Sequence, residues 1–190
     1  MLKRICLLAC LIFLPGLSHA TIQMKDRITL LDSNGGILCR NHLQENPLWP
    51  LFSSKGIKTS RGCTANYTGY TAAWLIKDGK LYLENYYSGY KSLDRKEIEA
   101  HSRMKELFPR ARGPVLAEWY TGTLHFGSGS MKKSIHLGHT DLFEFLHVYR
   151  IRTGIVESQK TYQYPASIDY YKKRDQEQAD RVKKMIAEGK

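Results

Sequence analysis

The sequence has few cysteines and lacks short motifs that mark many enzyme sites. Four of its 190 residues are cysteine, and neither Cys39 nor Cys63, the two beyond residue 20, belongs to a C-x-x-C pair. This disfavours a catalytic thiol. No serine occupies a G-x-S-x-G pattern, which disfavours a serine hydrolase of that type. Residues 127–130 are rich in glycine but lack the lysine and the following helix of a phosphate-binding loop, which disfavours nucleotide binding.

Long apolar runs are absent beyond the N-terminus. The first twenty residues have the parts of a secretion signal: a charged start at Lys3 and Arg4, an apolar stretch over residues 5–14, and small residues before a cut after Ala20. We therefore expect a Sec-type signal peptide and a periplasmic or secreted protein. Lipidation at Cys10 stays open, although it would leave almost no apolar stretch before the cut. No later segment approaches the ~20 apolar residues of a membrane span.

Acidic residues are outnumbered by basic ones. The chain has 29 Lys and Arg against 18 Asp and Glu, and loss of Lys3 and Arg4 with the signal lowers the formal net charge from +11 to +9. A basic surface suits an anionic partner, although solubility alone also accounts for it. We expect a partner that is an envelope protein or an anionic envelope component. Because nucleic acid is a poor partner for an exported protein, we expect none, and we expect no cofactor.

Export gives the two remaining cysteines a structural use. An oxidising compartment favours a disulfide bond between Cys39 and Cys63. This bond would close a loop of roughly 25 residues and contribute on the order of 3 kcal/mol to stability. The alternative is a pair of buried free thiols.

The stretch from Tyr67 to Tyr90 predicts one long β-hairpin that turns at Asp78-Gly79. Asp-Gly between alternating apolar residues is a strong hairpin signal, because a type I′ turn needs positive φ at both central residues. The expected pairs are Lys77 with Lys80, Ile76 with Leu81, Leu75 with Tyr82, and Trp74 with Leu83. Alternation then places Tyr87 on the more apolar face, toward the core, and Tyr86 on the opposite face.

The remaining segments predict further strands and two helices. The expected β elements are an early hairpin over residues 28–40, a strand over 115–126, a turn at 127–130 and a second long hairpin over 143–162. Helices are expected over residues 94–107 and from residue 169 onward. In the apolar segment 47–52, Trp49 and Phe52 are expected to plug one end of the core.

These elements predict a mainly β (α+β) fold class. We expect an antiparallel sheet, as a sandwich or a partly open barrel built from long hairpins, with one or two peripheral helices. The chain divides into a signal peptide over residues 1–20, a β domain over 21–165 and a polar C-terminal helix over 166–190. That helix has only a narrow apolar stripe, so its docking on the sheet stays open.

Four motifs follow one another along the middle of the chain. They are W-L-I-K-D-G-K-L-Y-L over residues 74–83, L-F-P over 107–109, G-P-V-L-A-E-W-Y-T-G-T-L over 113–124, and I-H-L-G over 135–138. In this order they resemble a group of small uncharacterised bacterial β-rich proteins, over roughly residues 69–162. The resemblance implies a fold element and no chemistry.

Two sets of residues are weak candidates for chemistry. His136, His139 and Asp141 offer two imidazoles and a carboxylate, which are ligands that Zn²⁺ accepts. The alternative is a polar turn before a strand. Glu118 and Glu144 lie in expected strands and would serve as acid and base in sugar cleavage if they were held ~5–9 Å apart. More often such a glutamate faces solvent or pairs with an arginine.

Tyrosine is the remaining candidate for binding. Tyr82, Tyr86, Tyr87 and Tyr90 lie on the central hairpin, and tyrosine offers rigid apolar area together with a hydroxyl, which suits recognition of proteins or glycans. The alternative is ordinary strand composition, since tyrosine favours strands.

The sequence thus predicts a non-enzymatic binding or accessory protein outside the cytoplasm. The competing hypothesis is a small hydrolase acting on envelope material, through His136, His139 and Asp141 or through Glu118 and Glu144. The absence of a coherent catalytic motif favours the first hypothesis without deciding whether the protein is an enzyme.

Overall fold

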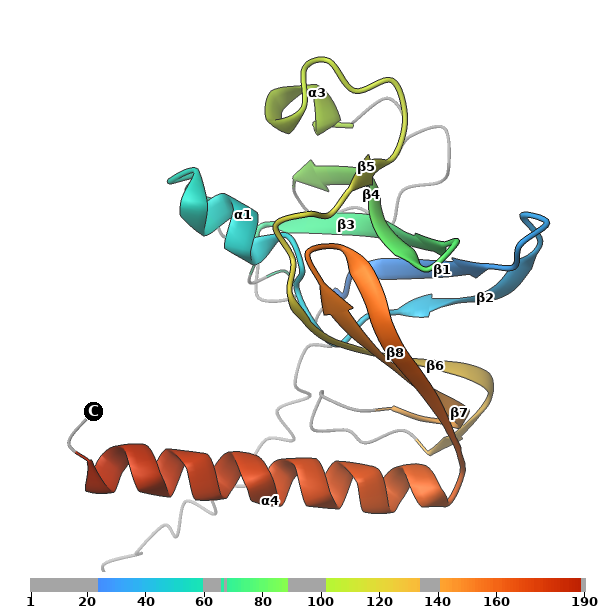
Figure 1. The fold of residues 1–190 in the computed structure, drawn as a ribbon, viewed down its shortest axis with the longest axis vertical. Coiled ribbons are helices and arrows are strands. Elements are labelled where there is room, and N and C mark those ends of the chain that lie inside the picture. The colour runs from blue at the N-terminus through green and yellow to red at the C-terminus, as the bar shows by residue number, and fades with distance from the viewer. Residues whose placement is uncertain (1–23, 60–65, 67, 89–101, 134–140, 189–190) are drawn as a thin grey trace, which may run out of the picture.

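The structure, a computed structural model, describes residues 24–59, 66, 68–88, 102–133 and 141–188. Within these ranges eight strands form one mixed sheet in the order β2-β1-β3-β4-β8-β7-β6, with β5 paired to β4, and helices lie around it (Figure 1). The sheet is open and not closed into a barrel, and the expected mainly β class is confirmed. In chain order the described elements are β1 (Arg27–Leu31), β2 (Ile37–His42), α1 (Trp49–Ser54), β3 (Tyr70–Lys77), β4 (Lys80–Ser88), α3 (Met104–Leu107), β5 (Val115–Leu116), β6 (Gly122–Lys133), β7 (Leu142–Arg152), β8 (Ile155–Gln163) and α4 (Ala166–Ala187).

The central hairpin is confirmed over the four pairs nearest its turn. The antiparallel strands β3 and β4 pair Lys77 with Lys80, Ile76 with Leu81, Leu75 with Tyr82, and Trp74 with Leu83. Asp78 and Gly79 have φ values of 50° and 69°, as a type I′ turn requires. Trp74, Leu81 and Leu83 are fully buried, so this hairpin forms the centre of the core.

Further from the turn, a β-bulge reverses the predicted faces. The register shifts beside Trp74, and Glu84 becomes an extra residue opposite no residue of β3. Because side chains alternate between the two faces of a sheet, one extra residue moves every later side chain of that strand to the opposite face. Tyr86 therefore joins the main core cluster, and the prediction that Tyr87 rather than Tyr86 faces this core is wrong.

The early hairpin is confirmed as β1 and β2, but the sheet is not antiparallel throughout. β1 pairs antiparallel with β2 and parallel with β3. A parallel pair needs a long connection between its strands, and here the connection from β2 to β3 contains α1. The expectation of an antiparallel sheet is therefore corrected to a mixed sheet with one parallel pair.

The strand expected over residues 115–126 is broken by a turn. The backbone N–H of Ala117 donates to Leu81 O at 2.9 Å, which extends the pairing with β4, and the N–H of Tyr120 donates to Ala117 O at 2.9 Å. This turn takes the chain from β5 to β6, which pairs with β7 instead. The turn expected at residues 127–130 is also wrong, since those residues continue β6.

Gly127 lies within β6, and the glycine is needed there for a close contact with a neighbouring strand and not for a turn. A Cβ atom at this position would overlap the ring of Phe143 on β7. The carbonyl of Gly127 also accepts a hydrogen bond from Asn41 Nδ2 at 2.9 Å. Asn41 belongs to β2, so this side chain bridges the two edge strands of the open sheet.

The sheet has two parts that meet at a corner. β4 and β8 share one register pair, Lys80 with Ile155. Two backbone bonds of 2.8 Å reinforce it, from Leu81 N to Gly154 O and from Val156 N to Gly79 O. The main core cluster takes residues from both parts and from α1.

Helix α1 closes one end of this core, but with different residues from those expected. Leu48, Leu51 and Phe52 are buried, whereas Trp49 is 54% exposed. The expectation that Phe52 plugs the core is confirmed, and the same expectation for Trp49 is wrong. Trp119 approaches from the turn before β6 and donates its Nε1–H to Pro47 O at 3.0 Å.

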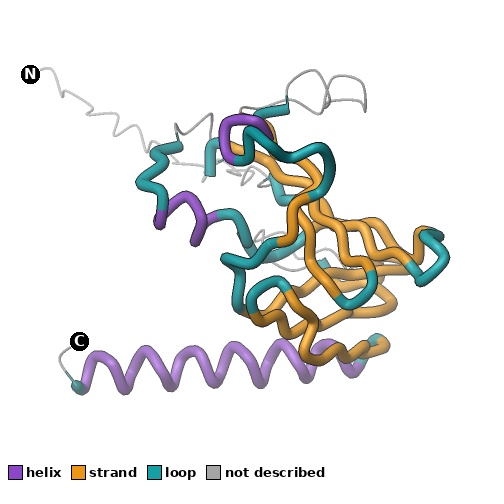
Figure 2. The backbone as a smooth tube through the Cα atoms, turned by 45° about the horizontal axis from the view of Figure 1, so that its top comes forward, coloured by secondary structure: helices purple, strands orange, loops and turns teal. Residues whose placement is uncertain are grey.

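Helix α4 docks on the sheet through its first turns and then leaves it. Tyr171 is buried in a second cluster with Leu142, Leu146 and Val148 of β7. From Asp175 to Ala187 every residue is exposed, and this part of the helix extends past the sheet (Figures 1 and 2). Of the helices that the structure describes, none combines the length and apolar character that crossing a membrane needs.

Candidate functional site

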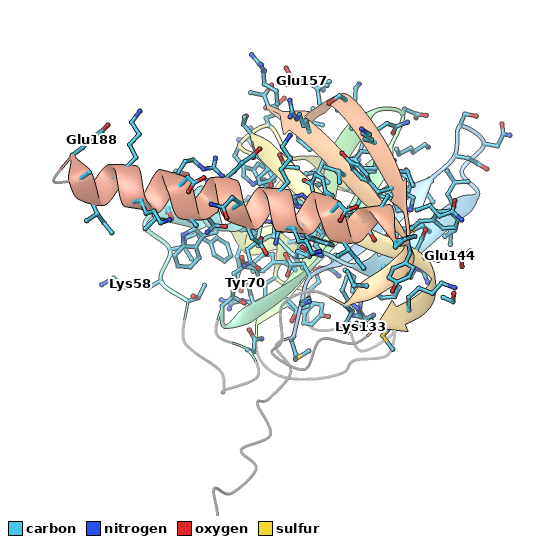
Figure 3. The ribbon with its side chains drawn as sticks, turned by 90° about the horizontal axis from the view of Figure 1, so that it is seen from below. Lys58, Tyr70, Lys133, Glu144, Glu157 and Glu188 are labelled. Atoms are coloured by element: carbon cyan, nitrogen blue, oxygen red, sulfur yellow. The ribbon has the colours of Figure 1, made fainter. Side chains whose placement is uncertain are left out.

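A cavity of about 440 Å³ lies between α1, α3 and the ends of β3 and β4 that are distant from the hairpin turn. Its volume falls within the ~300–1,000 Å³ typical of small-molecule sites. Figure 3 shows two of its lining residues, Lys58 on the loop after α1 and Tyr70 at the start of β3.

The inner wall of the cavity is aromatic. The Phe52 ring packs edge-on against Tyr70, with ring centroids 5.0 Å apart, and against Tyr86, with centroids 5.7 Å apart. Leu107 of α3 and Ile57 complete the apolar lining. Because the bulge at Glu84 turns Tyr86 inward, the same irregularity that corrects the fold also builds this wall.

The rim of the cavity carries an ion pair held by α3. Arg103 donates to Glu106 through Nε and Nη2, both at 2.6 Å, and the Arg103 backbone N–H donates to Tyr86 O at 2.9 Å. The hydrogen bonds from Arg103 hold the pKa of Glu106 below its usual range, and the same bonds raise the pKa of Arg103. Both groups are exposed, so this pair keeps its charges at the mouth of the cavity.

Tyr70 is the buried polar residue of the lining. It is 1% exposed, and its hydroxyl has no hydrogen-bond partner among the residues that the structure describes. Burial, followed by the nearby Asp26 carboxylate, raises the pKa of Tyr70, so the hydroxyl keeps its proton. A buried hydroxyl without a partner costs about 1–3 kcal/mol, and because this oxygen is closed off from solvent, Tyr70 contributes its ring to the lining.

The four tyrosines proposed from the sequence do not share one open face. Tyr86 lines the cavity and is 4% exposed, and Tyr87 is 2% exposed and lies outside the main cluster. Tyr82 is half-buried on β4. Tyr90 lies outside the described residues. Of this set, Tyr86 is the residue that the structure places at a cavity.

The structure does not bring Glu118 and Glu144 together. Glu118 is exposed in the turn before β6, which corrects its expected place in a strand. Glu144 lies on β7 as expected, and it accepts hydrogen bonds from Ser130 N at 3.3 Å and Ser130 Oγ at 3.1 Å, near the far end of β6. The intervening part of β6 spans roughly 25 Å at ~3.3 Å per residue. The Ser130 backbone N–H is the main cause that lowers the pKa of Glu144.

The proposed metal ligands and disulfide fall largely outside the described residues. His136 and His139 lie there, so their metal site with Asp141 stays a prediction. Among the described residues, no group of three His, Cys, Asp or Glu side chains is placed to hold a metal ion. Cys39 is buried, and its Sγ lies 3.6 Å from Gly127 O. Cys63 is not described, so the disulfide also stays a prediction.

A partly buried polar cluster that the sequence did not predict joins Glu45, His125 and Tyr170. His125 Nδ1 lies 2.5 Å from Glu45 Oε1, and His125 Nε2 lies 2.6 Å from the Tyr170 hydroxyl. A carboxylate only accepts, so His125 Nδ1 donates to Glu45, and His125 Nε2 shares a second hydrogen bond with the Tyr170 hydroxyl. Burial is the main cause that raises the pKa of Tyr170, which makes this hydroxyl a poor nucleophile. The cluster therefore fixes α4 to β6.

Sequence reasoning missed the cavity and this cluster for the same reason. Phe52, Tyr70, Tyr86 and Arg103 come from four separate elements, and no fixed spacing links them. Phe52 lay in the apolar segment 47–52, and Tyr70 and Tyr86 lay in the predicted central hairpin, which is the signal that the sequence contained. The chain matches no protein-family model, no curated protein and no solved structure.

Proposed function

We propose that this chain is an exported, non-enzymatic binding protein whose ligand occupies the cavity between α1, α3 and the ends of β3 and β4. The observation that carries the proposal is the cavity itself, with an aromatic inner wall and an ion pair at its mouth. Small-molecule sites combine a largely apolar concave wall with a few placed polar groups in this way.

Export rests on the sequence. The charged, apolar and small-residue parts of the first twenty residues support a periplasmic or secreted location. The excess of basic residues supports a partner in the envelope, either a protein or an anionic component. The carboxylate version of the competing hydrolase hypothesis has no comparable support, because Glu118 lies in the turn before β6 whereas Glu144, on β7, bonds to Ser130 near the far end of β6. The version with His136, His139 and Asp141 stays a prediction.

The experiment is a titration of the mature protein with the uncharged fluorescent probe N-phenyl-1-naphthylamine. Ile57→Trp enlarges a side chain in the lining and is expected to weaken binding roughly tenfold, the equivalent of ~1.4 kcal/mol. Ile155→Trp is the matched control, because Ile155 is 39% exposed against 37% for Ile57 and does not line the cavity.

Two results would contradict the proposal. One is a wild-type protein that gives no fluorescence increase while remaining folded by circular dichroism. The other is an Ile57→Trp variant that binds the probe as tightly as the Ile155→Trp variant, since binding would then occur elsewhere.

A further inference from the structure

We infer that the cavity takes an anionic amphiphile, meaning a small molecule with one negatively charged head group and an apolar or aromatic body. This inference rests on the proposed function and adds the chemistry of the ligand. It is carried by the juxtaposition of the aromatic wall of Phe52, Tyr70 and Tyr86 with a net positive rim.

The wall selects the body of the ligand. Phe52, Tyr70 and Tyr86 are closely packed, at 2%, 1% and 4% exposed, so each presents a small part of its surface to the cavity, and their edge-on contacts fix the rings. Removal of apolar ligand surface from water against these fixed rings is favourable. A fully polar ligand, such as a free sugar phosphate, would leave this wall unused.

The rim selects the head group. Within the described part of the chain its charged residues are Lys58, Arg103 and Glu106, and their formal charges of +1, +1 and −1 sum to +1. Both carboxylate oxygens of Glu106 already accept from Arg103. No acidic group within the described part of the chain pairs with Lys58. The positive charge of Lys58 is therefore available to interact with a ligand.

Glu106 competes with such a ligand for Arg103. The carboxylate occupies Nε and Nη2 of the guanidinium, which is the fork that a carboxylate or phosphate head group would also use. Removal of this competitor should tighten the binding of an anion and weaken that of a cation. The sign of the Glu106→Gln effect therefore reports the charge of the preferred head group.

The test compares three ligands with the same eight-carbon chain by isothermal titration calorimetry: octanoate, octanol and octylammonium. We expect octanoate to bind most tightly and its affinity to fall as salt is added. Lys58→Gln should weaken octanoate binding about two- to fivefold, the range for an exposed charge pair. Lys55→Gln is the matched control, because Lys55 is exposed on the same segment and does not line the cavity. Glu106→Gln should strengthen octanoate binding.

The outcomes separate this inference from the proposed function. If N-phenyl-1-naphthylamine binds in the cavity but octanol or octylammonium binds as well as octanoate, the anionic head group is wrong and the binding function stands. If Glu106→Gln weakens octanoate binding, the competition argument is wrong. If neither probe nor octanoate binds, both proposals fail.

A second arm identifies the source of the anion. Flotation with phosphatidylglycerol vesicles, against phosphatidylcholine vesicles, tests a lipid head group, and octanoate in solution tests a free acid. Binding in either arm that Lys58→Gln weakens and Lys55→Gln leaves unchanged supports the inference. Binding in neither arm overturns it.

Discussion

Asp26 is a carboxylate placed in the core, and its partners explain how β1 is fixed to β3. It is 3% exposed, and it accepts hydrogen bonds from Ala72 N and from Trp74 Nε1, both at 2.9 Å. Burial raises the pKa of Asp26 from 3.8 to about 7, although these two hydrogen bonds act in the opposite direction. The side chain therefore gains a proton on folding over much of the acidic range.

This raised pKa predicts how Asp26→Asn changes with pH. Between pH 4 and 7 the folded state binds more protons than the unfolded state, so stability due to Asp26 is greatest below pH 4 and falls as pH rises to about 7. The free energy of unfolding of the wild type, relative to Asp26→Asn, should fall over this window by on the order of 4 kcal/mol at most. Urea unfolding at pH 4, 5.5, 7 and 8 measures it. Asp180→Asn, at an exposed site, is the control, and a difference that stays constant with pH would contradict this account.

Gly127 shows that a glycine in a strand can mark a close contact. A Cβ atom there would overlap the ring of Phe143, so Gly127→Ala should lower the free energy of unfolding by about 1–3 kcal/mol. Gly113→Ala is the matched control, since a Cβ at Gly113 meets nothing within 4 Å. Phe143→Ala removes the ring, so the double variant should be less destabilised than the sum of the single variants. Additive effects would show that the contact with Phe143 is not the cause.

At the scale of elements, the hydrogen bond between Tyr170 and His125 should determine how firmly α4 is held. Tyr170→Phe removes the hydroxyl that lies 2.6 Å from His125 Nε2, which should cost about 1 kcal/mol of stability and increase amide exchange over residues 166–174. Tyr164→Phe is the control, because its ring lies in the same cluster and its hydroxyl has no partner among the described residues. If Tyr170→Phe and Tyr164→Phe change stability and amide exchange equally, the hydrogen bond between Tyr170 and His125 does not hold α4.

The second half of α4 should behave differently from the first. Its residues from Asp175 to Ala187 are all exposed, and helices shorter than ~12–15 residues without packing are marginal in water. We expect rapid hydrogen exchange over this half and slow exchange over β7 and the first turns of α4. Mass spectrometry of peptic peptides measures both. Strong protection along the whole helix, in a sample shown to be monomeric, would contradict this prediction.

At the scale of the whole molecule, the elements that depend on local signals were predictable. Asp78-Gly79 specified a turn type and, through it, a register, because both are set by neighbouring residues. The hairpin of β7 and β8 was predictable for the same reason. The bulge at Glu84 and the break at Ala117 were not, because they depend on where distant strands must meet. The same applies to the cavity, whose wall comes from separate elements.

The proposed binding function in the envelope requires that the protein is exported. Intact mass spectrometry tests this export and the predicted disulfide bond together. Protein recovered from the periplasm or the medium should have the intact mass of a chain that begins at Thr21. If Cys39 and Cys63 form a disulfide bond, reduction should increase this mass by two hydrogen atoms. Cys63→Ser should show no mass change on reduction. Cys39 is buried, and burial raises the pKa of its thiol, so a free Cys39 would react slowly with alkylating reagents until the protein is unfolded. If both cysteines become alkylated when the protein is unfolded without reductant, they are free thiols and the predicted disulfide bond is wrong. If instead the protein is found in the cytoplasm with the mass of the full-length chain, export is contradicted, and with it the hypothesis that the ligand is bound in the envelope.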